Sequence, residues 1–204
     1  EHCLSRPTPP AAEIMLSSVH DLKSEVKRLT ALLTEFKNIA WPQKLARGPV
    51  NLERLIRQLA GEIEARSRGQ GVELSLECQA DLPFLNGDDD KLRQALHNVL
   101  DNALDAMPGG GRLAIEAYER EQTICIDIID TGVGIPTNLK VFDLFSSTKS
   151  EGIGLGLFLV QQIVLAHDGA VTYSSTPGQG TTFRVTFPLN PSPEPFGADF
   201  LDLI

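Results

Sequence analysis

The chain lacks a long apolar run, an excess of basic residues and more than a few cysteines. No run of about eighteen apolar residues occurs, so we expect no membrane-spanning helix. The net charge of −9 argues against nucleic-acid binding and against docking on anionic lipid, since both need basic patches. Three scattered cysteines (Cys3, Cys78 and Cys125) are typical of a reduced, cytoplasmic protein rather than a disulfide scaffold. The chain has no signal peptide and begins with Glu1, so we expect a fragment and leave a membrane-anchored parent open.

Several common catalytic signatures are also absent. The sequence contains no GxxxxGK[ST] loop, no HRD or DFG, no His/Cys cluster with zinc spacing and no GxSxG. Glycine instead gathers in four short islands, at 109–111, 132–134, 152–156 and 178–180. Because glycine permits positive φ and close backbone approach, such islands can converge on one ligand pocket.

The first fifth of the chain predicts a coiled-coil-like helix. Residues 1–12 are Pro-rich and read as a loose segment, and a helix is expected over 13–41. Its apolar positions follow a heptad pattern that predicts a seam against a partner helix, although packing on the chain's own domain is the alternative. These positions are Val19, Leu22, Val26, Leu29, Leu33, Phe36 and Ala40. Pro42 ends the pattern, and we expect a linker over 42–50.

The remainder predicts one domain over 51–190 and an acidic, apolar tail over 191–204. Helices are expected at 51–66, 89–106 and 154–167, and strands at 72–78, 112–119, 123–130, 170–175 and 181–188. The strands come in hairpin pairs and do not alternate one to one with helices. This order favours an α+β two-layer sandwich, with a mixed, largely antiparallel sheet and the helices on one face.

Five motifs occur in a fixed order: LRQALHNVLDNALDAM (92–107), DTGVGIP (130–136), VFDLFSSTK (141–149), GIGLGLFLVQQIVLAHDG (152–169) and PGQGTTF (177–183). Together they resemble the GHKL superfamily with its Bergerat fold, and within it the ATP-binding domain of nitrogen-regulation-like histidine kinases. The resemblance covers about residues 14–188. It identifies 13–41 as part of a dimerisation helix, the second helix of the phosphoacceptor hairpin.

The resemblance also implies site residues for ATP and Mg²⁺. Asn102 would bind the metal and Asn98 would face the phosphates. Asp130 would accept a hydrogen bond from the adenine 6-amino group. Lys149 would contact phosphate, and Asn98 and Lys149 would be the catalytic residues. The remaining nucleotide-binding residues implied are Gly132, Gly134, Ile135, Phe142, Phe145, Thr148, Gly152, Gly154, Leu155, Gly156, Leu157 and Thr182. Phe142 and Phe145 would anchor a lid over the nucleotide. The stretch between Pro136 and Phe142 is a few residues shorter than is usual in the family.

Asn98 indicates a kinase rather than a hydrolase. Hydrolytic relatives have a general-base glutamate at this position, whereas an amide cannot take a proton from water. The neighbouring His97 could be catalytic, but the interpretation we favour is a helix neighbour near the site.

No phosphoacceptor histidine is identified. His20 is rejected because too few residues separate it from Pro42 for a helix to turn and run back. The chain is therefore expected to act as the catalytic part of a homodimeric sensor histidine kinase that relays phosphate to a response regulator. The alternatives are a non-catalytic nucleotide-sensing or dimerisation module, and a serine kinase of the anti-sigma type. The tail at 196–204 is either a docking segment or a disordered end.

Overall fold

The computed structural model describes residues 14–19, 22–23, 26, 45–146 and 154–189. The chain divides into two compact units, Glu1–Gln43 and Lys44–Ile204. In the described parts of both units, no helix combines the length and apolar character that crossing a membrane requires.

The described residues of the first unit are helical. They are 14–19, 22–23 and 26, and their large apolar side chains are exposed, with Leu16 at 70% and Val19 at 61%. The described polar residues of this unit are exposed as well, so the partner-helix seam stays a prediction. The rest of the predicted helix, including the heptad positions after Val26, lies outside the described residues.

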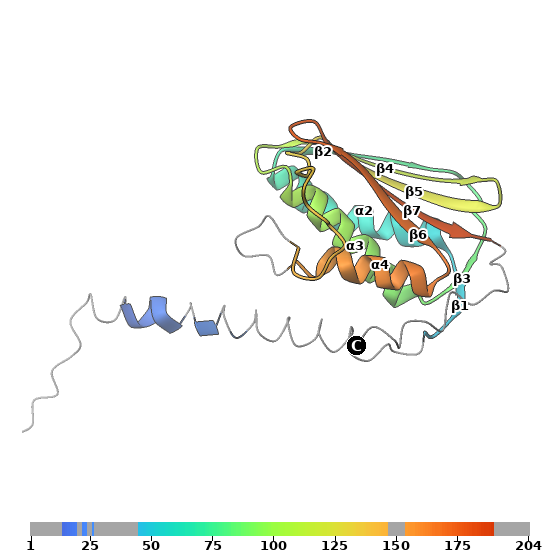
Figure 1. The fold of residues 1–204 in the computed structure, drawn as a ribbon, viewed down its shortest axis with the longest axis horizontal. Helices are drawn as coiled ribbons and strands as arrows, with labels where there is room; N and C mark the ends of the chain where they lie inside the picture. The colour runs from blue at the N-terminus through green and yellow to red at the C-terminus, as the bar shows by residue number, and fades with distance from the viewer. Residues whose placement is uncertain (1–13, 20–21, 24–25, 27–44, 147–153, 190–204) are drawn as a thin grey trace, which may run out of the picture. The chain divides into compact units, whose positions relative to one another are not determined.

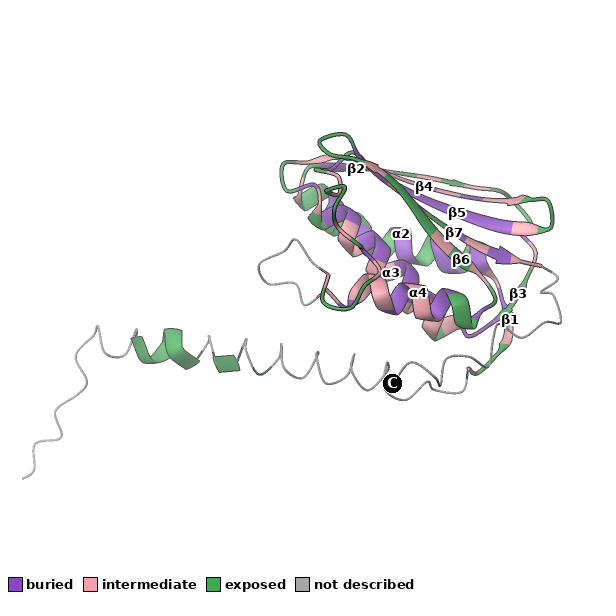
Figure 2. Cartoon of the chain, viewed as in Figure 1, coloured by how far each residue is buried: buried purple, intermediate pink, exposed green. Residues whose placement is uncertain are grey.

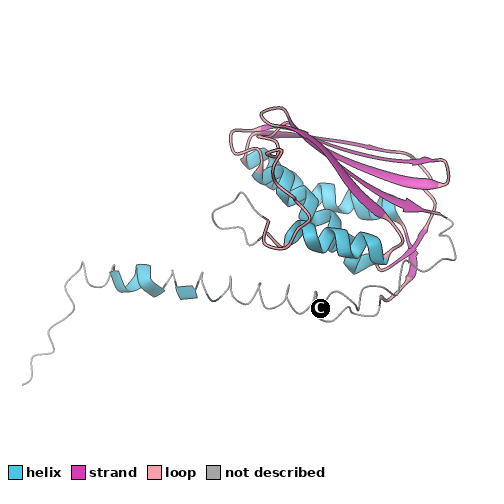
Figure 3. Cartoon of the chain, in the orientation of Figure 1, coloured by secondary structure: helices cyan, strands magenta, loops and turns pink. Residues whose placement is uncertain are grey.

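The second unit is a sheet covered on one face by helices. Five strands, β2 (Val72–Cys78), β4 (Gly111–Arg120), β5 (Thr123–Asp130), β7 (Gly180–Pro188) and β6 (Ala170–Thr176), lie side by side in that order. Only the β2–β4 pair is parallel. Helices α2 (Leu52–Gly69), α3 (Asp89–Asp105) and α4 (Gly156–Ala166) lie together below the sheet in Figure 1. Figure 3 shows the two layers, and they confirm the predicted α+β sandwich.

Alternation along the strands explains the two faces of the sheet. Ile124, Ile126 and Ile128 are at most 1% exposed and face the helices. Each such side chain contributes about 1.5–3 kcal/mol through burial. The intervening Asp127 faces the other side, where both of its carboxylate oxygens accept hydrogen bonds from Arg184 at 2.7 Å. Figure 2 shows the buried residues concentrated between the sheet and the helices.

Element boundaries differ from the prediction by more than one residue in three places. Residues 48–50, which we assigned to the linker, form β1 (Gly48–Val50), antiparallel to β3 (Leu85–Gly87). Helix α2 extends beyond residue 66, and the buried Ser67 hydroxyl donates to the Ile63 carbonyl at 3.0 Å. Helix α4 begins two residues later than predicted, because Gly154 has φ of +73°, which a helix excludes.

A buried histidine joins β3 to the end of α4. His167 is 2% exposed, and its Nε2 accepts a hydrogen bond from the Asp88 backbone N–H at 2.9 Å. The ring proton therefore lies on Nδ1, which donates to the Ile163 carbonyl at 2.7 Å. A second ring proton, on Nε2, would point at the Asp88 N–H, which is also a donor. Burial, the largest effect, lowers the pKa of His167.

The chain entering the domain is held at the same junction. The Ala46 N–H donates to the Asp88 carboxylate at 2.9 Å. Arg47 donates to the Asp168 carboxylate at 2.9 Å and to the Ala166 carbonyl, at the end of α4, at 2.6 Å. A cation at a helix C-terminus also interacts favourably with the helix dipole. Burial raises the pKa of Asp88, but hydrogen bonds from the Ala46 and Lys91 N–H groups outweigh it, so this pKa is lowered.

The His167 site predicts acid sensitivity. Because the folded-state pKa lies below the unfolded value of about 6.5, neutral His167 contributes stability that is present above that pH and lost as pH falls through the folded pKa. The free energy of unfolding should then decrease with a limiting slope of about 1.4 kcal/mol per pH unit for one proton. Denaturant titrations from pH 8 to pH 5 would measure this slope.

The matched variant is His167→Gln, whose side-chain oxygen can still accept from the Asp88 N–H. Its unfolding free energy should be lower than wild type at pH 8 and nearly independent of pH down to 5. An equal slope in both proteins would contradict the assignment to His167.

Candidate functional site

Helix α3 presents two asparagines toward the start of α4. The N-cap is Asp88, whose carboxylate accepts from the Lys91 N–H at 3.2 Å. The residues Leu92, Ala95, Leu96, Val99, Leu100 and Ala103 are buried in the core. Asn98 and Asn102 lie four residues apart on one helix face and are half-buried. A Cβ added to Gly156 would lie 4.0 Å from Asn98 Cγ and from Asn102 Nδ2. The two amides and the first residue of α4 are therefore close together.

The start of α4 offers backbone N–H groups. Its N-cap, Leu155, is buried and makes no side-chain capping bond. Leu157 is half-buried in the first turn. Uncapped N–H groups at a helix N-terminus carry partial positive charge and suit anions. Gly154, just before the helix, approaches the backbone of Phe145 and Ser146 so closely that a Cβ would lie 2.6 Å from both.

Asp130, the last residue of β5, is a buried carboxylate. It is 4% exposed, and its Oδ1 accepts from the Gly132 N–H at 2.8 Å and the Thr181 N–H at 3.2 Å. Burial raises the pKa of Asp130, and the two N–H donors lower it by less. One oxygen is thus engaged by the protein, and the other can accept from a ligand donor.

The glycines around Asp130 are required by the protein's own backbone. A Cβ on Gly132 would lie 2.5 Å from the Ala106 carbonyl oxygen. Gly134 has φ of +70°, and a Cβ there would lie 2.4 Å from the Thr176 carbonyl oxygen. At Gly180, φ is +106° and a Cβ would lie 2.0 Å from the Asp130 carbonyl oxygen. The island at 132–134 and the hairpin at 178–180 therefore pack against each other.

The two phenylalanines of 141–149 behave differently. Phe142 is half-buried, and its ring lies edge-on to Tyr173 with centroids 5.9 Å apart. Phe145 is 68% exposed with φ of +63°, so the expectation that it anchors a lid is not met in this structure. Thr148, Lys149 and Gly152 lie outside the described residues, and their roles stay predictions.

The sequence of the second unit matches the profile of a known family over residues 87–191: "Histidine kinase-, DNA gyrase B-, and HSP90-like ATPase". That range is about half of the chain and contains every described residue of the site above. The chain belongs to this ATPase family.

Individual relatives of this ATPase-family chain carry kinase names. Sporulation kinase A of Bacillus subtilis is 32% identical over 81% of this chain, and the signal transduction histidine-protein kinase AtoS of Escherichia coli is 31% identical over 82%. The matched part is 28% of the length of each relative. Among solved structures, full-length ShkA in complex with AMPPNP has a TM-score of 0.76 and 25% identity, covering 93% of this chain and 42% of ShkA.

Two residues beside Asp130 were not predicted from the sequence. Thr181, not Thr182, faces Asp130, because Thr182 pairs with Ile129 and Ser174 on the opposite face of the sheet. The signal was available, since Thr181 alternates in phase with the apolar Phe183, Val185 and Phe187. Ser175 also lies here, 3.0 Å from the Thr181 hydroxyl, and a single serine in a strand gave no signal.

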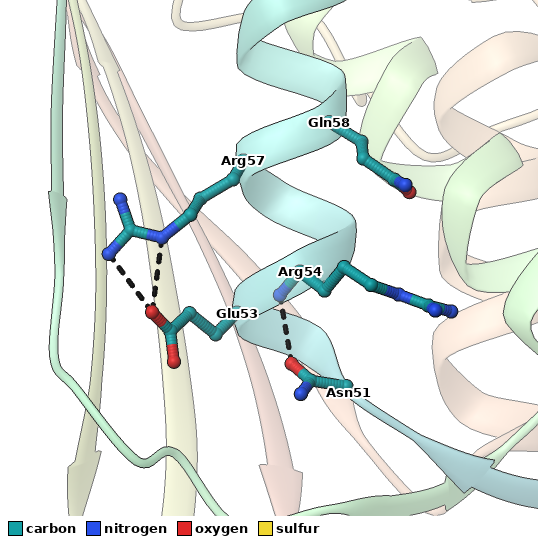
Figure 4. Close-up of a pocket in the computed structure, with 5 residues that line it drawn as sticks. All are labelled: Asn51, Glu53, Arg54, Arg57 and Gln58. Atoms are coloured by element: carbon teal, nitrogen blue, oxygen red, sulfur yellow. Dashed lines mark hydrogen bonds and ion pairs between the residues drawn. The ribbon is translucent and has the colours of Figure 1, made fainter.

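Other features of the ATPase domain lie outside this site. A shallow pocket at the start of α2 is lined by Asn51, Glu53, Arg54, Arg57 and Gln58 (Figure 4). Some of these lining residues bind one another: Arg57 forms an ion pair with Glu53, and the Asn51 side chain accepts from the Arg54 N–H. His97 pairs with Asp101 at 3.0 Å on α3, in agreement with a helix neighbour near the site. His20 and the tail lie outside the described residues.

The glycine packing around Asp130 predicts a contrast between two neighbouring substitutions. Gly180→Ala forces a Cβ onto the Asp130 carbonyl and should lower the free energy of unfolding by more than about 3 kcal/mol. Gly178 also has positive φ, at +77°, but faces open space. Gly178→Ala should therefore cost only the backbone strain, about 1–2 kcal/mol. Denaturant midpoints compare the two, and equal losses would mean that contact with Asp130 is not the constraint.

Proposed function

We propose that this chain is the ATP-binding catalytic part of a two-component sensor histidine kinase. It transfers the γ-phosphoryl group of Mg·ATP to a histidine on a dimerisation hairpin, for relay to a response-regulator aspartate. The observation that carries the proposal is the presence of two features in one domain. Asp130 is a buried carboxylate with one oxygen hydrogen-bonded to the protein, and the amides of Asn98 and Asn102 lie close to the uncapped N-terminus of α4. The kinase names of the relatives and the AMPPNP complex of ShkA support the same assignment.

Two parts of the domain bind different parts of the nucleotide. Asp130 holds the adenine 6-amino group through the carboxylate oxygen that the protein leaves available, which selects a base with a donor at that position. The α4 start, with Gly154 and Gly156, receives the phosphates on its N–H groups. Positioning and charge neutralisation of this kind supply most of what phosphoryl transfer requires.

The donor set at Asn98 and Asn102 fits Mg²⁺. The described residues contain no group of three His, Cys, Asp or Glu side chains that could hold a metal. Amide oxygens are hard ligands, and Mg²⁺ characteristically takes most of its ligands from water and substrate phosphates. Asn102, with Asn98 beside it, would hold the ion, which supplies charge neutralisation on the phosphates. Asn98 does not activate water, so the γ-phosphoryl group is kept for the protein acceptor.

The whole-protein features are part of the proposal. The acceptor histidine is supplied from outside the described residues, and the kinase works as a homodimer through its helical hairpin. The response-regulator receiver domain is the second protein partner, and this part of the kinase works in the cytoplasm, where ATP is available. Lys149 and Thr148 remain the proposed phosphate contacts from the segment 147–153.

Nucleotide binding is tested by Asp130→Asn. The amide oxygen can keep both backbone hydrogen bonds, so stability should equal or exceed that of wild type, because an amide carries no charge to desolvate. The amide NH₂ then meets the adenine amino group donor to donor, so the Kd for Mg·ATP should rise about 10- to 100-fold. Calorimetric titration and thermal melting measure the two effects.

The matched control is Asp127→Asn, on the same strand but the opposite face. It weakens the pair with the half-exposed Arg184, so stability should fall by about 1 kcal/mol while the Kd for Mg·ATP stays unchanged. Wild-type affinity in Asp130→Asn would contradict the adenine role of Asp130.

Phosphotransfer is tested by adding the complete dimerisation hairpin of the parent protein in trans with radiolabelled ATP. Acid-labile, base-stable phosphate on the hairpin is the expected product. Acid-stable phosphate on a partner serine would favour the anti-sigma-type alternative. ATP binding without transfer would favour the nucleotide-sensing module.

A further inference from the structure

Two side chains of the edge strand β6 contact the segment 131–142. The Ser175 hydroxyl accepts a hydrogen bond from the Ile135 N–H at 2.8 Å. Two residues earlier, the Tyr173 ring contacts Phe142 edge-on, with centroids 5.9 Å apart. This segment starts directly after Asp130, so β6 contacts the residues that follow the carboxylate proposed to bind adenine.

Strand alternation puts both contacts on the helix-facing side of β6. In the register with β7, Tyr173 pairs with Phe183 and Ser175 pairs with Thr181. Phe183 and Thr181 are buried, and the Tyr173 and Phe183 rings are 5.9 Å apart. Ser174, between them, points to the opposite face and is exposed.

The Ser175 hydroxyl connects the segment to Asp130. Besides accepting from Ile135, it lies 3.0 Å from the Gly180 carbonyl oxygen and 3.0 Å from the Thr181 hydroxyl. One hydroxyl donates once and accepts twice. All three contacts are satisfied when Ser175 donates to Gly180 and Thr181 donates to Ser175. Thr181 in turn donates its backbone N–H to Asp130.

The last residue of β6 and the turn that follows it add backbone contacts. The Gly178 N–H donates to the Val133 carbonyl at 2.8 Å, and Gly134 lies against the Thr176 carbonyl. These contacts do not depend on a side chain of β6, so the segment stays near the hairpin when Ser175 is changed. The side chains of β6 then fix two further positions of the segment: Ser175 holds Ile135 and Tyr173 holds Phe142.

We propose that Ser175 and Tyr173 are positioning residues for the nucleotide: together they hold the segment 131–142 in its binding conformation before ATP arrives. This rests on the proposed function. A segment already ordered in the free protein loses less conformational entropy on binding, so affinity rises without a direct contact to the ligand. Neither residue touches the reacting groups.

Ser175→Ala tests the first contact, with Ser174→Ala as the matched control on the opposite face. Loss of the Ser175 hydroxyl should raise the Kd for Mg·ATP about 3- to 20-fold. The amide exchange of Ile135 should accelerate in the same variant, because its acceptor is gone. Ser174→Ala should leave both unchanged, and Ser175→Thr, which keeps the hydroxyl, should restore both.

Tyr173→Ala tests the second contact, with Tyr173→Phe as the conservative variant. The alanine removes the ring that packs on Phe142 and should raise the Kd for Mg·ATP about 2- to 10-fold. Tyr173→Phe keeps the ring and should bind like wild type. Calorimetric titrations run well below each variant's melting temperature separate this effect from unfolding.

The results distinguish failure of the proposed function from failure of the positioning role. A wild-type chain that binds no ATP would overturn the proposed function, and the positioning role with it. A wild-type chain that binds ATP, together with undiminished affinity in both Ser175→Ala and Tyr173→Ala, would overturn the positioning role alone. Weakened binding in Ser175→Ala without faster Ile135 exchange, or without recovery in Ser175→Thr, would also overturn it.

Discussion

The pairing register between β5 and β7 determines where two acidic side chains lie. Asp127 and Asp130 are three residues apart, so alternation puts them on opposite faces of the sheet. In the observed register Asp127 opposes Arg184 and Asp130 opposes Thr181. A shift of one residue would turn every side chain of β7 to the other face. Asp127 would then lose its guanidinium partner, and Asp130 would lose a buried N–H donor. Gly180 fixes this register, because only a residue without Cβ fits against the Asp130 carbonyl.

The architecture followed from the sequence because its signals are local. Period-two alternation in 112–119 and 123–130 and the apolar face of 89–106 each identify one element, and hairpin-like spacing identifies how strands pair. The short strands β1 and β3 were missed for a related reason: three residues are too few to show a period. Their pairing joins residues 48–50 to 85–87, a long-range contact that no local pattern records.

The site was predicted unevenly, also for physical reasons. Asn98, Asn102 and Asp130 stand in motifs whose order carries information, and the structure brings Asn98 and Asn102 close to the start of α4. Thr182 was chosen over Thr181 because adjacent threonines look alike until the face of β7 is considered. The packing of Phe142 on Tyr173, and the exposure of Phe145, depend on which rings meet across the fold, and spacing along the chain does not encode that.

The parallel pairing of β2 with β4 places part of the folded domain outside the range that matches the family. The family match starts at residue 87, after α2 and β2, and yet includes the described nucleotide-site residues. Leu52, Leu55, Ile56, Leu59 and Ile63 of α2, all at most 3% exposed, belong to the same core as the site helices. A polypeptide cut to the matched range would uncover the edge of β4 and the apolar surface beneath α2. Unpaired strand edges and exposed apolar surface promote self-association, so such a fragment would aggregate although the proposed nucleotide-binding residues were all present.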